Sequence, residues 1–411
     1  MLTISQWWCF MLSDASATRP QDSPHQVRPS ARTTSQRDDA APVVRIDSFA
    51  GAREVLRCPD VRQAGFNAEL VARFIGPAHA PVLYQDGEPH QKQRSATARF
   101  FAPRVVATRY RELIERTSHE LVARFRAAGR GRLDDMSLEL AVAVAADIVG
   151  LTESDRARMA VRLNRFFSAP VSGHGTIATL RQALLGQWRM LSFHWFDVRP
   201  AIRVRRRTPR EDVISHLIQE GYSDREILTE CLTYGAAGMA TTREFIVMAA
   251  WRLLEREDLR ARFLQGDEQD RMTILEEVLR LEPVVSTLKR RATRDLVVDS
   301  GAGPMAIAAN SLVEIEVGAA NRDPSAAGPC PHQLDPDRAR PAKASASLMS
   351  FGDGPHRCPG AAVALHEAAI FLDQLLRVPG LHLEQVPAMT INPVSSGYEL
   401  RGAVIAVAPQ R

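Results

Sequence analysis

The sequence is poor in cysteine, tyrosine and tryptophan, and it has no long apolar run. Its 411 residues contain only five of each of these three residue types. The cysteines show no paired spacing, which favours a reducing cytoplasm without a disulfide framework. No apolar run approaches the length of a transmembrane helix, and Met1–Leu12 lacks the basic and long apolar regions of a signal peptide. The sequence therefore predicts a cytoplasmic protein without a membrane partner.

Charge and length narrow the possibilities further. The net charge of +4 is too small to indicate a nucleic-acid partner, although clustered arginines could serve an acidic protein. With 45% hydrophobic residues the chain can bury a large core, and length alone would favour two domains. The motifs below span residues 86 to 360 and depend on one another, so we predict one domain over residues 43–411. Residues 1–42, polar from residue 13 onward, are expected to form a disordered tail.

The chain is organised around Phe351–Gly360, a glycine-rich loop that contains Cys358. Its three glycines allow positive φ angles and close approach to a flat ligand. A helix-compatible run, Ala361–Leu376, follows directly. A thiol at a helix N-terminus beside His356 and Arg357 is expected to shift toward the thiolate. Such a thiolate is a metal ligand or a nucleophile, and the alternative is an inert cysteine in a structural turn.

The pattern Phe351-x-x-Gly354-x-x-x-Cys358-x-Gly360 resembles the haem-binding loop of the cytochrome P-450 family. The resemblance implies haem b (iron protoporphyrin IX) with Cys358 as the axial iron ligand. It also implies cofactor contacts from Phe351, Gly352, His356 and Gly360. The implied fold is mainly α with small β-sheets, a triangular helix-rich prism. In that fold the haem lies between a long central helix and the helix that follows the cysteine.

Three cationic side chains resemble the family's ligands for the haem propionates. His90 and Arg94 are four residues apart and share one face of a helix that opens at residues 86–90. They match a His-x-x-x-Arg motif, and the alternative is a solvated basic face. Arg290, in an extended segment, matches the arginine for the second propionate. Arg291 is the alternative, because a shift of one residue in register reverses the face.

The long central helix is predicted from Ser223 to about Glu255. Ser223 and Glu226 form a capping box, and the helical pattern continues without a proline. Gly235 and Gly238 each cost about 1 kcal/mol relative to alanine. This part of the helix is therefore predicted to be thin and deformable, so that a flat ligand can lie against Ala237.

The same segment resembles the family's Ala-Gly-x-acid-Thr-Thr motif, in which an alcohol and a carboxylate help deliver protons during oxygen activation. Thr241 matches the alcohol and Thr242 follows it, but Ala240 stands where the acid is expected. A carboxylate is thus absent from that position. Glu244, a water chain or a substrate group could substitute. The alternative role for both threonines is hydrogen bonding to helix carbonyls.

A buried ion pair is predicted on the helix that ends before Pro283. Glu277 and Arg280 are three residues apart and match the family's Glu-x-x-Arg motif, with Arg338 as a third partner by resemblance. Two other helices are expected over 152–167, with Thr152 as N-cap, and over 176–204. The second carries aromatic residues that fit either the core or the roof of a substrate pocket, and basic residues 203–210 are expected to be solvated. These aromatics are Trp188, Phe193, Trp195 and Phe196.

The resemblance implies a bacterial-type, soluble, monomeric monooxygenase of secondary metabolism. It would oxidise a small, apolar organic metabolite with O2, and take electrons from a ferredoxin and its reductase docked near Cys358. Because Ala240 replaces the acid, oxidative coupling or peroxide-driven chemistry on the same haem fold is the first alternative. A zinc protein is the remote one, with Cys330, His332, His356 and Cys358 as ligands but without a Cys-x-x-Cys knuckle. Metal content separates these classes.

Overall fold

The structure is a computed structural model, and it describes residues 42–66, 68, 80–167, 176–301, 303–339, 345–392 and 395–408. The predicted N-terminal tail, except for residue 42, lies outside the described residues. The α-helices are α2 (Phe49–Arg57), α4 (Gly87–Ala98), α5 (Pro103–Val105), α6 (Arg111–Ala128), α7 (Leu133–Val149), α8 (Arg156–Phe167), α9 (Thr176–Phe193), α10 (Arg199–Arg207), α11 (Val213–Gln219), α12 (Asp224–Tyr234), α13 (Thr241–Glu255), α14 (Glu257–Gln265), α15 (Glu268–Leu281), α16 (Val317–Ala320), α17 (Pro324–Ala327) and α18 (Ala361–Leu376).

Short helical turns and strands complete the fold. The 3-10 turns are η2 (Val82–Tyr84), η3 (Arg99–Phe101) and η7 (Gly354–His356), and the π-helical segments are η4 (Val106–Tyr110), η5 (His194–Val198) and η6 (Gly235–Ala240). The strands are β1 (Val43–Ile46), β2 (Val61–Gln63), β3 (Arg130–Arg132), β4 (Thr287–Ala292), β5 (Leu296–Asp299), β6 (Pro304–Ile307), β7 (Leu312–Glu316), β8 (Leu381–Gln385), β9 (Ala388–Asn392), β10 (Gly397–Arg401) and β11 (Val404–Val407). The prediction of a mainly α fold with small sheets is confirmed.

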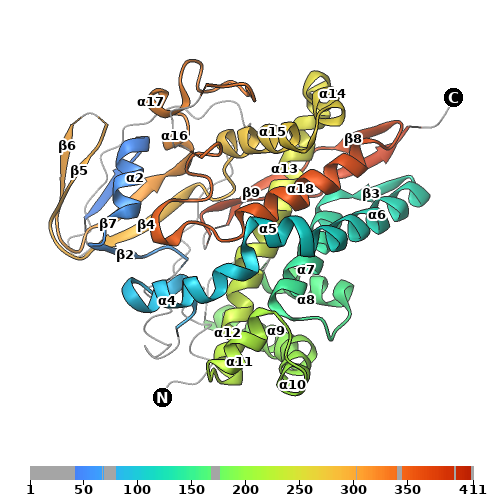
Figure 1. The fold of residues 1–411 in the computed structure, drawn as a ribbon, viewed down its shortest axis with the longest axis horizontal. Helices are drawn as coiled ribbons and strands as arrows, with labels where there is room; N and C mark the ends of the chain where they lie inside the picture. Colours follow the sequence, from blue (N-terminus) through green and yellow to red (C-terminus); the bar gives the residue numbers. More distant parts are fainter. Residues whose placement is uncertain are drawn as a thin grey trace.

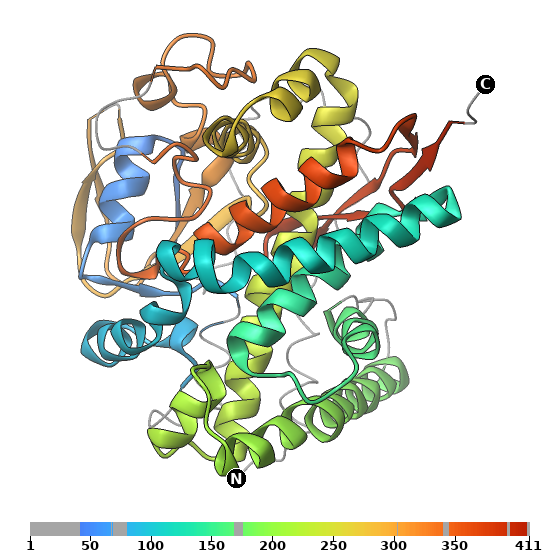
Figure 2. The ribbon, with the colours of Figure 1, turned by 45° about the vertical axis from the view of Figure 1, so that its right-hand side comes forward.

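Helices form the middle of the molecule, and small sheets flank them on two sides (Figure 1). One flank is a four-stranded sheet in the order β1-β7-β4-β2, packed with α2 around a separate apolar core. The other carries the three-stranded sheet β3-β11-β8. Helices α6 and α18 lie side by side across the central helix (Figure 2). This packing places the helix that follows Cys358 against the main hydrophobic core.

The central helix is built from α12, η6 and α13. Ser223 caps it as predicted, with the capping box to Glu226 complete. The backbone stays helical from residue 224 to 255, but Gly235–Ala240 adopts π-helical hydrogen bonding. Gly238 lies close to α7, where an added Cβ would stand 3.9 Å from the Cβ of Ala145. The predicted deformable segment is therefore a π-bulge, a feature that is frequent at functional sites.

Two local predictions are wrong. Thr152 is not a helix N-cap, because α8 begins at Arg156 and Asp155 Oδ1 accepts the hydrogen bond of the Arg158 backbone N–H at 2.8 Å. Thr152 instead accepts a hydrogen bond from Arg205. Arg205 is not solvated with the rest of residues 203–210: it is buried and pairs with Asp212. Asp212 lies two residues after this segment, and the second carboxylate partner, Glu153, lies 52 residues before Arg205.

The aromatic residues of the 176–204 helix divide between two faces. Phe193 is buried at 1% exposure, as a core residue would be. Trp188, Trp195 and Phe196 are exposed at 68%, 54% and 60%. A core position is therefore wrong for these three side chains.

Candidate cofactor-binding site

Cys358 is held in a tight loop between η7 and α18. Its backbone N–H donates to the Phe351 carbonyl at 2.8 Å, and the Arg357 N–H donates to the Gly354 carbonyl at 3.1 Å. Gly352 has φ +69° and Gly354 has φ +66°, which favour glycine. The Gly360 backbone N–H forms a hydrogen bond to the Cys358 sulfur. The loop thus presents one sulfur atom at the start of a helix.

Contacts with α2 fix the position of this loop. A Cβ added at Gly354 would stand 2.2 Å from the Leu56 carbonyl oxygen, so only glycine fits there. Beside it, both carboxylate oxygens of Asp353 accept hydrogen bonds from Arg57 at 3.0 Å. Because α2 packs on the flanking sheet, these contacts anchor the loop to that sheet at Asp353 and Gly354.

The expectation that the Cys358 thiol is shifted toward the thiolate is wrong for the protein alone. Burial raises the pKa of this thiol, and the opposing effects of the Gly360 N–H, Arg94 and Arg357 are smaller. A metal cation at the sulfur would reverse this balance, since coordination deprotonates a thiol. The site therefore suits a thiolate that is formed together with its metal.

A cavity of about 560 Å³ opens beside Cys358 between α4 and α18. Its lining residues are Arg94, Ser95, Thr97, Ala98, Phe101, Ala102, Pro103, Arg357, Cys358, Pro359, Ala361 and Ala362. The Phe101 ring stacks on Tyr234 of the central helix with centroids 5.8 Å apart. In the π segment that follows Tyr234, Ala236 and Ala237 are exposed although Gly235 and Met239 are buried. The central helix thus leaves small residues uncovered in the middle of the molecule.

Two histidines and an aspartate link α4 to the cysteine loop. The rings of His90 and His356 stack with centroids 4.0 Å apart, and His356 Nε2 lies 3.1 Å from Asp86 Oδ1. Burial, together with the nearby cations His356 and Arg94, lowers the pKa of His90 to about 4. His90 is therefore neutral at physiological pH unless an anion arrives beside it.

The two arginines that matched propionate ligands lie differently. Arg94 lines the cavity and donates to the Arg357 carbonyl of the cysteine loop. Arg290 is 4% exposed and donates to the side chain of Gln63 at 2.6 Å and to the Lys289 carbonyl at 2.8 Å. Arg291 points to the other face of β4 and donates to the Asn310 carbonyl at 3.0 Å. In the observed register of β4, the side chain of Arg290 is buried and that of Arg291 lies on the opposite face of the strand.

These residues fit a haem. Among the described residues no carboxylate lies within ion-pair distance of Arg290, and burial lowers its pKa to about 10. A buried cation with only neutral acceptors is costly unless an anion joins it. A flat group that brings carboxylates to Arg290 and a metal to Cys358 would satisfy both sites, and haem has this chemistry.

The alcohol motif lies at the end of the π segment. The Thr241 hydroxyl donates to the Ala237 carbonyl, four residues earlier, and Thr242 is buried. Glu244 is not placed to substitute for the missing acid. Its carboxylate accepts the Leu400 backbone N–H at 2.7 Å and pairs with Arg243 and Arg401. That carboxylate is committed to β10, so Ala240 has no replacement on the next turn.

The predicted ion pair of α15 forms a buried three-residue network. Arg280 donates two hydrogen bonds to Glu277 at 2.8 Å, and Arg338 Nε donates to the same carboxylate at 3.2 Å. Glu277 and Arg280 are 0% exposed. The Asn321 side chain joins the Arg280 carbonyl to the hydroxyl of Ser350. The network thereby braces the chain just before the cysteine loop.

Sequence reasoning missed two acidic groups near the site, the exposed Asp86 and the buried Glu230. Asp86 holds His356 and accepts the Gln63 backbone N–H at 3.1 Å. Glu230, on α12, accepts the Val82 N–H at 3.0 Å and the Gln93 side chain at 2.6 Å. Burial raises the pKa of Glu230 to about 7. A carboxylate on the inner face of a helix was the available signal for Glu230, and Asp86 gave none.

The zinc alternative is not supported. In the part of the chain that the structure describes, no group of three or more His, Cys, Asp or Glu residues could hold a metal ion, and all four proposed ligands belong to that part.

No helix among the described residues is long and apolar enough to cross a membrane.

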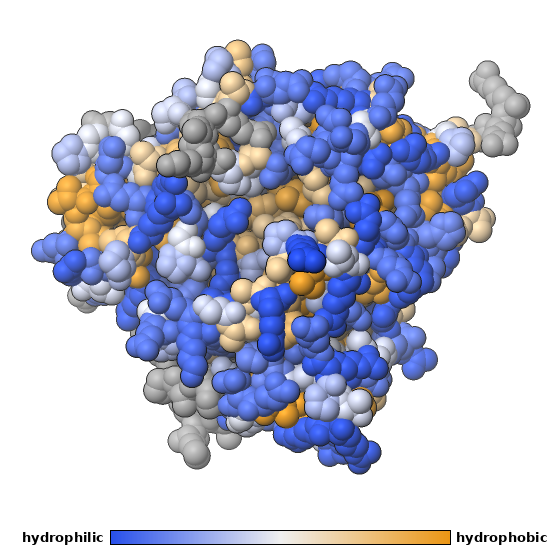
Figure 3. Space-filling model, viewed as in Figure 1, coloured by the Kyte–Doolittle hydropathy of each residue, from blue (hydrophilic) through white to orange (hydrophobic). Residues whose placement is uncertain are grey.

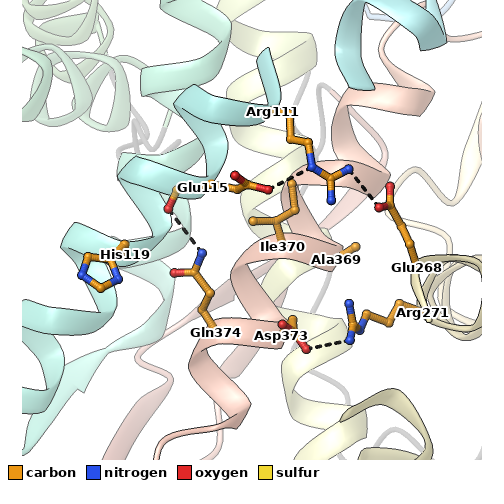
Figure 4. Close-up of a pocket in the computed structure, with 9 residues that line it drawn as sticks. All are labelled: Arg111, Glu115, His119, Glu268, Arg271, Ala369, Ile370, Asp373 and Gln374. Carbon is orange, nitrogen blue, oxygen red and sulfur yellow. Dashed lines mark hydrogen bonds and ion pairs between the residues drawn. The ribbon is translucent and has the colours of Figure 1, made fainter. Parts of the chain in front are cut away.

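A second cavity, of about 340 Å³, lies between α6, α15 and α18 (Figure 4). Its arginines already have carboxylate partners: Arg111 pairs with Glu115 and Glu268, and Arg271 pairs with Asp373. Both arginines of the cavity therefore have carboxylate partners within its wall.

The chain resembles known proteins over most of its length. A family model described as cytochrome P450 matches residues 201–393. The chain is 30% identical over 332 residues to nocardicin C N-oxygenase of Nocardia uniformis subsp. tsuyamanensis, over 76% of this chain and 77% of that protein. It is 27% identical over 310 residues to the biotin biosynthesis cytochrome P450 of Bacillus subtilis, over 74% of each. A solved post-tailoring hydroxylase of himastatin biosynthesis has the same fold, with a TM-score of 0.72 at 23% identity over 99% of this chain and 100% of that one.

Proposed function

Since the chain belongs to the cytochrome P450 family of haem-thiolate monooxygenases, we propose that it inserts oxygen from O2 into a small, apolar organic metabolite. Members of the family generally take electrons from redox partners and bind small substrates and O2. The observation that carries the proposal is the cavity that Cys358 and Arg94 line together, beside the stacked rings of His90 and His356.

The residues of this chain have separate roles in the proposal. Cys358 would ligate the haem iron, while His90, Arg94 and Arg290 would hold its propionates. When bound, the haem supplies the oxygen-activating chemistry, which a thiolate ligand favours by donating electron density. Thr241 would hold a proton at its hydroxyl oxygen beside the π segment, and Ala237 would leave room for cofactor and substrate. The apolar core around the cavity would exclude water.

The substrate and partners are inferred from relatives and from charge. One relative is named as an N-oxygenase of nocardicin C and a structural neighbour as a post-tailoring hydroxylase, which supports a small metabolite of secondary metabolism. Arg99, Arg104 and Arg357 are exposed around the cysteine loop and α4, and they suit an acidic ferredoxin supplied by its reductase. The four described cysteines are all free, which supports a cytoplasmic location.

Turnover with O2 and a surrogate ferredoxin system, compared with turnover by peroxide alone, tests the proposal. We expect products that carry one added oxygen atom and that label from 18O2. A second candidate is oxidative coupling or peroxide-driven chemistry, which Ala240 favours because it removes the acidic proton donor. Products formed by peroxide alone, without incorporation from O2, would replace the first proposal with the second.

A further inference from the structure

The outer face of the α9–η5 helix is apolar and exposed. We call it the aromatic face, and it consists of Leu184, Leu185, Trp188, Leu191, Trp195 and Phe196. These six residues are half of the twelve large hydrophobic residues that are exposed in the described part of the chain. Positions 184, 188, 191 and 195 follow the spacing of one helical stripe. Because the six exposed apolar side chains lie within thirteen residues, they form one surface and are not scattered over the molecule.

The inner face of the same helix is apolar too. Met190, Phe193 and Val198 are buried at 6%, 1% and 0% exposure. A helix that is hydrophobic on all sides is expected to be covered on all sides. Here the inner face packs on the protein, and the aromatic face is left exposed in the part of the chain that the structure describes.

The surrounding sequence is strongly basic. Residues 156–210 contain twelve arginines, no lysine and one acidic residue, Asp197, which gives this stretch a formal charge of +11. The whole chain has a charge of +4, so the remainder has a charge of −7. The single acid is buried and pairs with Arg162. Asp224 of α12 pairs with Arg206 of α10 at this end, so the charge around the aromatic face is mostly positive.

Several of these arginines lie next to the aromatic face. The Arg199 guanidinium lies over the Trp195 ring, 3.9 Å from its centroid. Arg203 and Arg207 are exposed on α10, and among the described residues no carboxylate pairs with them. Helices α9 and α10 lie together at one end of the molecule in both views (Figures 1 and 2). The cysteine loop and α18 lie elsewhere in the molecule.

We propose that the aromatic face and the arginines of α10 bind the surface of an anionic lipid membrane. Tryptophan rings and arginine side chains are suited to the boundary between headgroups and acyl chains. A second copy of the chain is disfavoured, because Arg199, Arg203 and Arg207 of the two copies would be brought together. The helix would lie on the membrane and would not span it. A search of the sequence for long apolar runs therefore does not detect this surface.

Vesicle flotation with the full-length, haem-loaded protein tests the proposal. Vesicles of phosphatidylcholine with phosphatidylglycerol are compared with phosphatidylcholine alone, at low and high salt. We expect binding to the anionic vesicles only, weakened by salt. The triple variant W188S/W195S/F196S should bind at least roughly tenfold more weakly. The single variants Arg203→Gln and Arg207→Gln should each weaken vesicle binding roughly fivefold.

The matched control is Val297→Ser, which removes a 65% exposed apolar residue on β5. Figure 3 shows apolar surface at the edge of the molecule where Figure 1 places β5 and β6, away from α9 and α10. This variant should bind vesicles as the wild type does. The absorption spectrum of each reduced variant under carbon monoxide should show that the variant keeps its haem. Equal binding by wild type and triple variant would overturn the proposal. So would a dimer that the triple variant abolishes in the absence of lipid, because a second copy would then cover the face. Binding that depends on residues 1–12 alone would overturn it as well.

Discussion

The guanidinium of Arg290 donates to the side-chain oxygen of Gln63 at 2.6 Å across the β2–β4 pair. A buried cation is thus held by a neutral amide, and Asp86 attracts it from a greater distance. This arrangement leaves the cation available for an incoming anion. It connects the strand register of the flanking sheet directly with cofactor binding.

Replacing Arg290 should therefore weaken haem binding. For Arg290→Leu we expect roughly a 10- to 100-fold faster loss of haem to apomyoglobin, since a hydrogen bond to a charged group contributes about 1.5–3 kcal/mol. Arg291→Leu is the matched control, because its side chain lies on the opposite face of β4. Equal haem loss from both variants would show that charge alone, rather than the buried position, matters.

Glu230 should make the stability of the protein depend on pH. Its pKa is raised from 4.5 to about 7 in the folded state, so the unfolded state releases its proton first as pH rises. The free energy of unfolding should fall by about 3 kcal/mol between pH 4.5 and 7, and this loss should persist above pH 7. Glu230→Gln keeps the shape and should abolish this decline.

Urea unfolding of the haem-loaded protein across that range measures the effect. Glu220→Gln, an exposed change in the same region, should follow the wild type. A parallel decline in the Glu230→Gln variant would place the pH dependence elsewhere.

Ala240→Asp should improve oxygen-dependent turnover. A carboxylate beside Thr241 would add the missing proton donor, and general acid catalysis contributes up to about 10²-fold. We expect more product and less peroxide for each electron consumed. Thr241→Ala should have the reverse effect, while Thr242→Ala serves as the buried neighbour control. An unchanged ratio of product to peroxide in Ala240→Asp would contradict a role for proton supply at this position.

Removing the Glu277 carboxylate should be strongly destabilising. It would leave Arg280 and Arg338 as buried cations without their shared partner, which costs about 3–5 kcal/mol. Asp337→Ala breaks the exposed pair with Arg262 and should leave the free energy of unfolding nearly unchanged. Chemical unfolding of both variants measures the difference. A cost below about 1 kcal/mol for Glu277→Gln would mean that the network is not needed for stability.

Much of the site could be anticipated from short-range patterns. The capping box at Ser223, the weak glycine segment and the cysteine loop depend on residues close in sequence, and such signals are local. The choice between Arg290 and Arg291 could not be made from sequence, because it depends on the pairing of β4 with β2 and β7. Long-range partners explain the errors as well. Thr152 and Glu153, 53 and 52 residues earlier, bind Arg205, and β10 holds Glu244 away from the position of the missing acid.

The raised pKa of Cys358 shows another limit. Its neighbours in sequence suggested a thiolate, but the desolvation that outweighs them arises from the whole fold. The exposed tryptophans of the 176–204 helix show the same limit from the opposite side, since apolar spacing does not reveal whether a partner lies outside the chain.

The central claim is that Cys358 ligates a haem iron, and one spectrum tests it most directly. The dithionite-reduced protein is measured under carbon monoxide beside Cys358→Ser, after expression with adequate haem. We predict the red-shifted Soret band of a thiolate-ligated haem in the wild type and its loss in the variant. A wild-type protein without haem absorbance, or a variant that keeps the red-shifted band, would contradict the account.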